Sequence, residues 1–163
     1  MNTLIVYDSQ FGNTEQVAQT IAETLREYGQ VQTVRVEHTH PLYLKDVDLL
    51  ILACPTQLLR PTRAMRYLLD YLPIESLQSI TVVCFDTRLD RVTWMTGSAA
   101  ELMTRKLRRR GVPHLLSFES FFVHESHGPL KSGELERAAA WARTLHEMSS
   151  ADPALRVGEK DKV

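Results

Sequence analysis

The sequence has little of what marks several large classes of protein. Only two of its 163 residues are cysteines, and its 19 Lys and Arg residues nearly balance its 20 Asp and Glu residues. No apolar run approaches the roughly 20 residues of a membrane-spanning helix, and no signal-peptide pattern precedes the first apolar run. The near-neutral charge gives no reason to expect nucleic acid or an acidic membrane as a partner. We therefore expect a cytoplasmic protein without a membrane span, in which Cys54 and Cys84 are free thiols.

The length and composition are those of one ordinary globular domain. Hydrophobic residues make up 44% of the chain and charged residues 24%, which is typical of a soluble fold with a substantial core. Beyond Ser149 the chain is polar and charged, with no apolar period. We therefore expect a domain over residues 1–148 and a disordered polar tail over residues 149–163.

Short apolar runs alternate with helical patterns along the chain. Strands are predicted over residues 4–7, 31–36, 48–54, 80–85 and 114–123, with an interruption of the last near Glu119. Helices are predicted over residues 17–28, 61–72, 99–107 and 135–145, and a loop or single turn over residues 37–47. Apolar strands separated by helices indicate a parallel sheet covered on both faces.

Residues 8–15 join the first predicted strand to the first helix. Ser9 and Thr14 supply hydroxyl groups there, and Gly12 allows close approach of the backbone. Because a helix start presents free N–H groups, this loop is suited to hold an anion, most often a phosphate. It contains no Lys or Arg. An ordinary helix start with a capping box at residues 13–16 is the alternative.

The run Ser9-Gln10-Phe11-Gly12-Asn13-Thr14 resembles the phosphate loop of flavodoxins, in which Ser/Thr-x-Thr-Gly-Asn-Thr wraps the phosphate of FMN. Phe11 stands where the family has Thr, so one family hydroxyl is missing. The loop matches neither the Walker pattern nor the three-glycine dinucleotide pattern. The resemblance implies a flavodoxin-like α/β fold: a doubly wound, five-stranded parallel sheet in the order 2-1-3-4-5, with helices on both faces.

Later segments extend the resemblance in the same order along the chain. Residues 54–57, Cys-Pro-Thr-Gln, end the third strand where flavodoxin relatives carry a Pro-Thr pair under the flavin ring. Residues 85–88, Phe-Asp-Thr-Arg, and 97–100, Gly-Ser-Ala-Ala, resemble a group of small bacterial flavodoxin-like proteins. Gly-Pro-Leu at 128–130 and Gly-Glu-Leu-Glu-Arg at 133–137 do so as well.

The resemblance implies an FMN site at the carboxyl edge of the sheet. The residues it assigns to the cofactor are Ser9, Gln10, Phe11, Gly12, Asn13, Thr14, Pro55, Thr56, Gln57, Leu58, Thr87, Arg88, Trp94 and Gly97. Trp94 could cover the ring or anchor its own loop, and Arg88 could approach the flavin or pair with Asp86 or Asp90. Residues 53–60 contain no Gly, so a peptide carbonyl aimed at flavin N5 is harder to reach.

Three further signals have a structural interpretation. His124 and His127 have the look of a metal pair but lack a further cluster of ligands, so no metal site is expected. Cys54 would lie close to the flavin, and a structural thiol is favoured over a redox one. The basic helix face at residues 105–110 is typical of a solvated surface, although it could dock an acidic partner or a pyridine-nucleotide phosphate.

We expect an FMN-binding redox protein that transfers electrons through a non-covalent flavin. The partner would be an unidentified redox protein or a small-molecule acceptor. We favour an electron carrier or redox partner over a stand-alone enzyme, and assign no catalytic residue. Electron-carrying flavodoxins are usually strongly acidic and this chain is not, so two alternatives stay open. One is a small NAD(P)H-dependent reductase of FMN or quinone type, and the other is a flavodoxin-fold binding module that has lost FMN.

Overall fold

The computed structural model describes residues 1–39 and 44–151, in which five parallel strands form one sheet in the order β2-β1-β3-β4-β5. The strands are β1 (Asn2–Tyr7), β2 (Gln30–Arg35), β3 (Leu49–Pro55), β4 (Thr81–Leu89) and β5 (Glu119–Val123). The predicted fold class and strand order are therefore confirmed.

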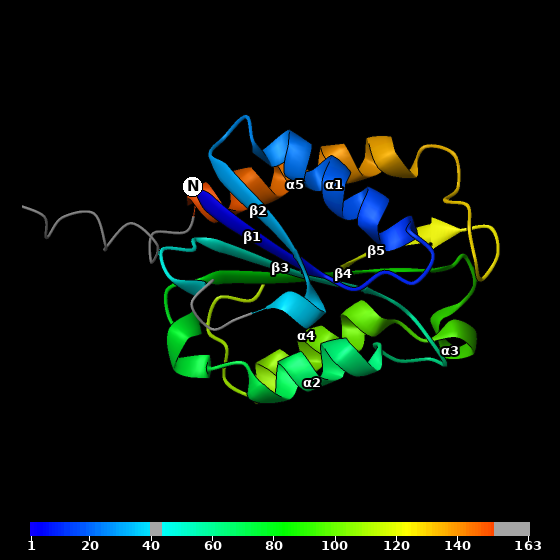
Figure 1. The fold of residues 1–163 in the computed structure, drawn as a ribbon, viewed down its shortest axis with the longest axis horizontal. Helices are drawn as coiled ribbons and strands as arrows, with labels where there is room; N and C mark the ends of the chain where they lie inside the picture. Colours follow the sequence, from blue (N-terminus) through cyan, green and yellow to red (C-terminus); the bar gives the residue numbers. More distant parts are fainter. Residues whose placement is uncertain (40–43, 152–163) are drawn as a thin grey trace, which may run out of the picture.

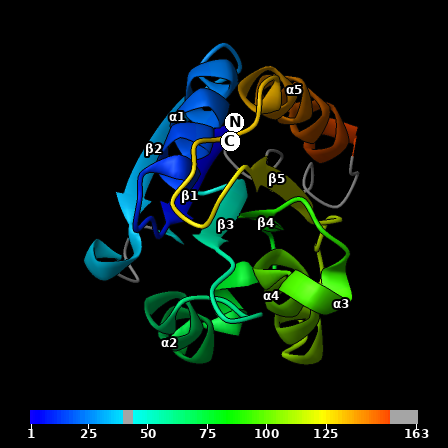
Figure 2. The same cartoon turned by 90° about the vertical axis from the view of Figure 1, so that its right-hand side faces the viewer.

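Helices cover both faces of the sheet (Figure 1). On one face lie α1 (Asn13–Leu25) and α5 (Glu134–Ala151), and on the other lie α2 (Arg63–Tyr71) and α4 (Ala99–Arg109). The short helix α3 (Thr93–Thr96) lies near the carboxyl ends of the strands (Figure 2). Among the described elements, 3-10 turns at Val36–His38 and Ile74–Leu77 lie in the connections. Within the described ranges, no helix is long and apolar enough to cross a membrane.

The central strands β1, β3 and β4 are largely apolar on both sides because each side packs on a helical layer. In β3, Leu49 and Ile51 belong to the core under α1 and α5, whereas Leu50, Leu52 and Cys54 belong to the core under α2 and α4. This assignment follows from the two-residue period of a strand, which points successive side chains to opposite faces. A parallel sheet covered on both faces therefore needs the continuous apolar runs seen in the sequence.

Two predicted strands change their bounds. β4 continues to Leu89, past the predicted end at Phe85, because its last residues pair with Phe121, Phe122 and Val123 of β5. Before Glu119 the chain meets β4 at a single isolated bridge, between Val82 and Leu115. The predicted interruption near Glu119 is therefore where β5 begins.

Helix ends follow the local chemistry of their caps. The second helix begins at Arg63 rather than Pro61, because Thr62 is its N-cap and accepts the N–H of Met65 at 3.4 Å. Ser98 caps α4, since its Oγ accepts the N–H of Glu101 at 3.1 Å. The last helix continues to Ala151, past the predicted boundary at 148. Residues 152–163 and 40–43 lie outside the described residues, so the disordered tail and the loop over 37–47 stay predictions there.

Both cysteines lie in the core under α2 and α4. Cys54 and Cys84 are free thiols and fully buried. Burial raises the pKa of both thiols, that of Cys84 to about 12, because a thiolate loses its solvation in the apolar interior. Neither thiol is suited to act as a nucleophile or redox group while the protein is folded.

We predict that the folded protein shows no fast reaction with a disulfide reagent such as DTNB at pH 8. The raised pKa values leave almost no thiolate, and burial blocks access. The same protein in denaturant, assayed under the same conditions, should release two equivalents of thiolate product, one for each cysteine. One equivalent released rapidly from the folded protein would contradict the buried placement.

The edge strand β5 is covered by a charged pair from the start of α5. The carboxylate of Glu134, which is nearly buried, accepts the N–H of Phe122 at 2.7 Å. The same carboxylate binds the guanidinium of Arg137 at 2.7 Å, and this guanidinium also donates to the carbonyl of Ser120. These side chains take the place of a neighbouring strand at an otherwise unpaired edge.

Glu134→Ala should lower the free energy of unfolding by about 1–3 kcal/mol, because it leaves the N–H of Phe122 without its acceptor and removes one of the two carboxylates that pair with Arg137. Urea denaturation followed by circular dichroism measures this change. Glu136→Ala is the matched control, since that side chain is exposed on the same turn and should change stability by less than about 0.5 kcal/mol. Equal effects of the two substitutions would show that the edge contacts contribute nothing.

Candidate functional site

The carboxyl ends of β1, β3 and β4 meet at the edge of the sheet that faces the viewer in Figure 2. A pocket of about 350 Å³ lies there, within the range of small-molecule sites. Eleven of the fourteen predicted site residues line it: Ser9, Gln10, Phe11, Asn13, Thr14, Pro55, Thr56, Gln57, Leu58, Thr87 and Arg88. Open parallel sheets bind ligands at this edge, where the chain order reverses direction.

The loop between β1 and α1 is organised around the hydroxyl of Ser9. Its Oγ accepts the N–H of Gly12 at 3.1 Å and the N–H of Glu15 at 3.3 Å. Gly12 is the N-cap of α1 with φ of 86°, a left-handed conformation that favours glycine. No side chain caps α1 from the N-cap position, so the capping box at residues 13–16 does not form. The first-turn N–H groups at Asn13 and Thr14 have no acceptor within the helix.

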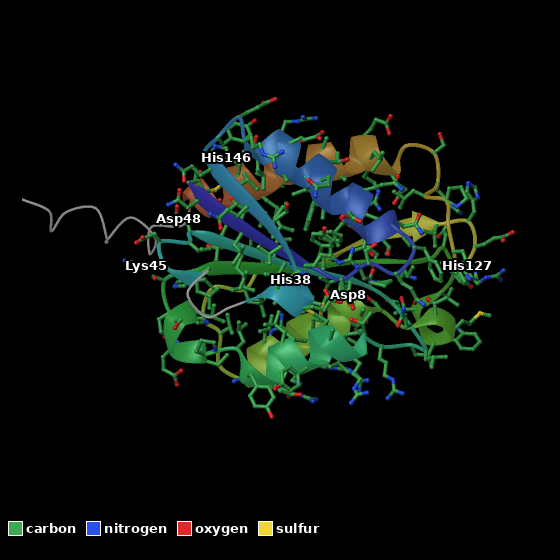
Figure 3. The ribbon with its side chains drawn as sticks, in the orientation of Figure 1. Asp8, His38, Lys45, Asp48, His127 and His146 are labelled. Atoms are coloured by element: carbon green, nitrogen blue, oxygen red, sulfur yellow. The ribbon has the colours of Figure 1, made fainter. Side chains whose placement is uncertain are left out.

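The first turn of α1 is tied to β4 and to the segment after β5. The hydroxyls of Thr14 and Thr87 lie 2.7 Å apart. The side-chain amide of Asn13 donates to the carbonyl of His127 at 3.1 Å, and the His127 ring lies 4.2 Å from the ring of Phe11. Figure 3 shows His127 at the carboxyl end of the sheet. The segment after β5 therefore packs on the loop, a role that the sequence did not assign to it.

A positive charge lies behind this loop although the loop itself has none. Arg35, at the end of β2, donates to the carbonyl of Ser9 at 2.8 Å and lies 3.7 Å from the carboxylate of Glu15. Glu15 also accepts the hydroxyl of Tyr7 at 2.7 Å. Burial and this hydrogen bond raise the pKa of Tyr7. Sequence reasoning did not assign Arg35 to the site. Its place follows from the parallel register of β1 and β2, which sets Arg35 beside Tyr7.

Asp86 is the most buried charged group of the site. Its Oδ2 accepts the hydroxyl of Ser98 at 2.7 Å, the hydroxyl of Thr56 at 3.0 Å and the N–H of Ala100 at 3.0 Å. Thr56 in turn accepts the N–H of Ala99 at 2.8 Å. The side chain of Thr56 is therefore committed to the protein, and what it offers the pocket is its backbone.

Arg88 lines the pocket but does not form the ion pair with Asp86 or Asp90 that the sequence left open. Its guanidinium donates to the hydroxyl of Ser120 at 3.1 Å and to the carbonyl of Arg91 at 2.9 Å. Asp90 pairs instead with Lys131 at 2.7 Å, which lowers the pKa of that carboxyl. Arg88 thus holds the segment after β4 in place.

Three predicted site residues lie outside the pocket. Gly12 shapes the loop but does not line the cavity. Trp94, on α3, has 81% of its surface exposed. Gly97 has φ of 68° and lies against the backbone of Leu59, where a Cβ atom would come within 2.4 Å of the Leu59 carbonyl oxygen. The structure does not bring Trp94 or Gly97 to the cavity, and their contact with a cofactor stays a prediction.

The turn after β3 has positive φ angles, although it contains no glycine. Leu58 and Leu59 have φ of 47° and 68°, both positive as in a type I′ turn. Gln57 and Arg60 flank them and exchange two backbone hydrogen bonds, of 2.9 and 3.0 Å. The side chain of Gln57 donates to that of Gln10 and so joins this turn to the first loop. Positive φ is therefore reached here without glycine.

Sequence reasoning also missed Leu89, Val123 and Ser126, which complete the lining of the pocket. Leu89 was placed in a loop because the predicted fourth strand ended too early. Val123 ends β5, and Ser126 belongs to the loop that follows it. Within residues 1–39 and 44–151, no three metal-ligating side chains gather. His38 and His127 lie apart in Figure 3.

The pocket has the chemistry of a site for a phosphate attached to a flat, partly polar ring. Among the described residues no carboxylate lines it, Arg88 adds one positive charge, and the start of α1 adds the favourable end of a helix dipole. Ser9, Asn13 and Thr14 line it beside the start of α1. These residues fit FMN, in which a phosphate monoester is joined to an isoalloxazine ring.

Comparisons with known proteins agree with this geometry. The sequence pattern named Flavodoxin matches residues 5–112. No curated protein matches the chain significantly.

Among solved structures, a flavodoxin from the domain Archaea has a TM-score of 0.74 at 19% identity, with 92% of this chain and 99% of that chain covered. Oxidised Flavodoxin 1 from Bacillus cereus has a TM-score of 0.74 at 18% identity, with 90% and 98% covered. Two-electron reduced Megasphaera elsdenii flavodoxin has a TM-score of 0.67 at 21% identity, with 87% and 98% covered. Those likenesses show the fold, and because the family pattern matches residues 5–112, more than half of the sequence, the chain belongs to the flavodoxin family.

Proposed function

We propose that the protein binds FMN non-covalently and transfers electrons through the flavin. Its family is one of FMN-binding electron-transfer proteins. The observation that carries the proposal for this chain is the loop at residues 9–14. There, Ser9, Asn13 and Thr14, which carry hydroxyls and first-turn N–H groups, line a pocket to which no carboxylate of the described residues contributes.

The residues of the pocket divide between the two ends of such a cofactor. Ser9 and Thr14, with the N–H groups at the start of α1, would hold the phosphate. Backbone groups at Thr56, together with Gln57 and Thr87, would meet the polar edge of the ring. When bound, the flavin supplies the redox chemistry, and the protein supplies position and electrostatics.

The two alternatives differ in what they require of the purified protein. A binding module that has lost FMN would be colourless and would not take up the cofactor. A small reductase would oxidise NADPH in the presence of a quinone, whereas an electron carrier would not. An absorbance spectrum with identification of the released cofactor, followed by this turnover assay, separates the three functions.

FMN should bind at least about a hundredfold more tightly than riboflavin, because charge-assisted hydrogen bonds to the phosphate contribute roughly 1.5–3 kcal/mol each. Fluorescence titration of the apoprotein with both ligands measures the difference. In Ser9→Ala the loop loses the hydroxyl that orders it, so affinity for FMN should fall about tenfold or more while affinity for riboflavin stays close to that of the original protein. Equal affinities of the original protein for FMN and riboflavin would refute a phosphate site at this loop.

Gly12→Val should abolish FMN binding, because a branched side chain at the helix start hinders the left-handed backbone and the close approach of a phosphate. Gly133→Val is the matched control. Gly12 and Gly133 both directly precede a helix, with φ of 86° and 85°, and a Cβ atom at either would meet no other atom within 4 Å. The two variants should lose similar stability in thermal melts, and only the first should lose FMN. Normal FMN binding by Gly12→Val would show that the loop is an ordinary helix start and does not hold the phosphate.

A further inference from the structure

The two helical layers of the molecule carry opposite charge. In α2 and α4 there are six basic residues, Arg63, Arg66, Arg105, Lys106, Arg108 and Arg109, against two acidic residues, Asp70 and Glu101. In α1 and α5 there are five acidic residues, Glu15, Glu23, Glu134, Glu136 and Glu147, against two basic residues, Arg137 and Arg143. The formal net charge of −1 therefore conceals a strongly dipolar surface.

The positive charge is concentrated at one groove between α2 and α4, which we call the basic groove. It has a volume of about 390 Å³ and is lined by Arg60, Pro61, Arg66, Leu69, Leu102, Arg105, Lys106 and Arg109. Five of these eight residues are cationic and none is acidic. Figure 1 shows the two helices side by side on the face of the sheet opposite α1 and α5.

Most of these cations have no acidic partner among the described residues. Lys106 pairs with Asp70. In the described part of the chain, no carboxylate lies within ion-pair distance of Arg60, Arg66, Arg105 or Arg109. The Nε of Arg66 is buried and has no hydrogen-bond partner among the described residues. Like charges gathered without counter-charges repel one another, so an external anionic surface would stabilise them.

The basic groove is continuous with the rim of the FMN pocket through the turn after β3. Leu58 lines the pocket and Arg60, two residues later, lines the groove. The rim also exposes large apolar side chains: Leu58 is 87% exposed, and Leu59, Trp94 and Met95 are exposed as well. Leu59 is bridged to Gly97, which keeps the turn and α3 together. Protein–protein interfaces commonly combine an apolar centre with polar and charged residues around it, and these exposed apolar side chains lie beside the charges of the basic groove in the same way.

We propose that the basic groove, together with this apolar rim, docks a partner protein that presents a carboxylate-rich surface. The role of that partner rests on the proposed function, because the docked surface would lie beside the FMN pocket and could exchange electrons with a bound flavin. Electrostatic complementarity of this kind raises the association rate and orients the partner, and salt weakens it. The polarity would be the reverse of that of an acidic carrier.

The test uses two probe proteins with the same fold and opposite charge: native cytochrome c, which is basic, and succinylated cytochrome c, which is acidic. Each is immobilised, and binding of the full chain is measured by surface plasmon resonance at about 20 mM ionic strength, where screening is weak. Both the apoprotein and the FMN-loaded protein are assayed. Succinylated cytochrome c should bind saturably and lose binding as salt is added, and native cytochrome c should bind at least about tenfold more weakly.

The decisive variant is Arg105→Glu with Arg109→Glu, which reverses two exposed charges that line the groove. It should weaken binding of succinylated cytochrome c about tenfold. The matched control, Arg26→Glu with Arg143→Glu, makes the same change in net charge at two exposed positions, the C-cap of α1 and the middle of α5, and should weaken binding by less than about twofold. If the groove variant fails to fold, Arg105→Gln with Arg109→Gln replaces it, with an expected loss of about threefold.

Equal weakening by the groove variant and its control would overturn the proposal, because only net charge would then matter. Equal binding of the two cytochrome probes would overturn it too. Saturable binding of NADPH that the groove variant loses, without binding of succinylated cytochrome c, would overturn it in favour of a nucleotide site. Titration of the original protein with FMN distinguishes failure of this proposal from failure of the proposed function. If the original protein binds succinylated cytochrome c but no FMN, only the proposed function is refuted.

Discussion

The buried carboxylate of Asp86 is the constraint on which the functional edge of this fold depends. An ionised group taken out of water costs several kcal/mol unless hydrogen bonds replace its solvation. Here the replacements come from Thr56 after β3, and from Ser98 and the N–H of Ala100 at the start of α4. One charge thus fixes where β3 ends and where α4 begins. All three hydrogen bonds reach Oδ2, and the buried Oδ1 has no hydrogen-bond partner among the described residues, so β3 and α4 are joined through one oxygen of that carboxylate.

This arrangement changes which groups remain for a ligand. The hydroxyl of Thr56 donates to Asp86 and accepts from Ala99, and the hydroxyls of Thr14 and Thr87 lie in contact with each other. In the proposed FMN complex, recognition of the ring edge at β3 would therefore fall to backbone groups, whose positions the sheet sets. At the other end of the pocket, Arg35 donates to the carbonyl of Ser9, so the loop that follows β1 is held from behind.

The sequence was sufficient for the features that depend on local patterns. Continuous apolar runs predicted a doubly covered parallel sheet, and the resemblance of short motifs to those of flavodoxins named eleven of the fourteen residues that line the pocket. The sequence was not sufficient for features that depend on contacts between elements far apart along the chain. Arg35 reaches the loop only because β2 lies beside β1, Asp86 acquires its partners from two other segments, and Trp94 follows a strand that is longer than its apolar run indicates. Each of these depends on tertiary register rather than on residue type.

The turn at Leu58 and Leu59 connects the pocket to the basic groove. A non-glycine residue in the left-handed region costs of order 1–3 kcal/mol and persists only where its surroundings fix it. Here the flanking residues exchange two backbone hydrogen bonds, and Gly97 leaves room for the Leu59 backbone. Burial does not compensate for that cost, because Leu58 remains largely exposed. The same four-residue turn places Leu58 at the pocket and Arg60 at the groove. A strained, exposed apolar turn at that junction is therefore explained better by contact with a ligand or partner than by the stability of the fold.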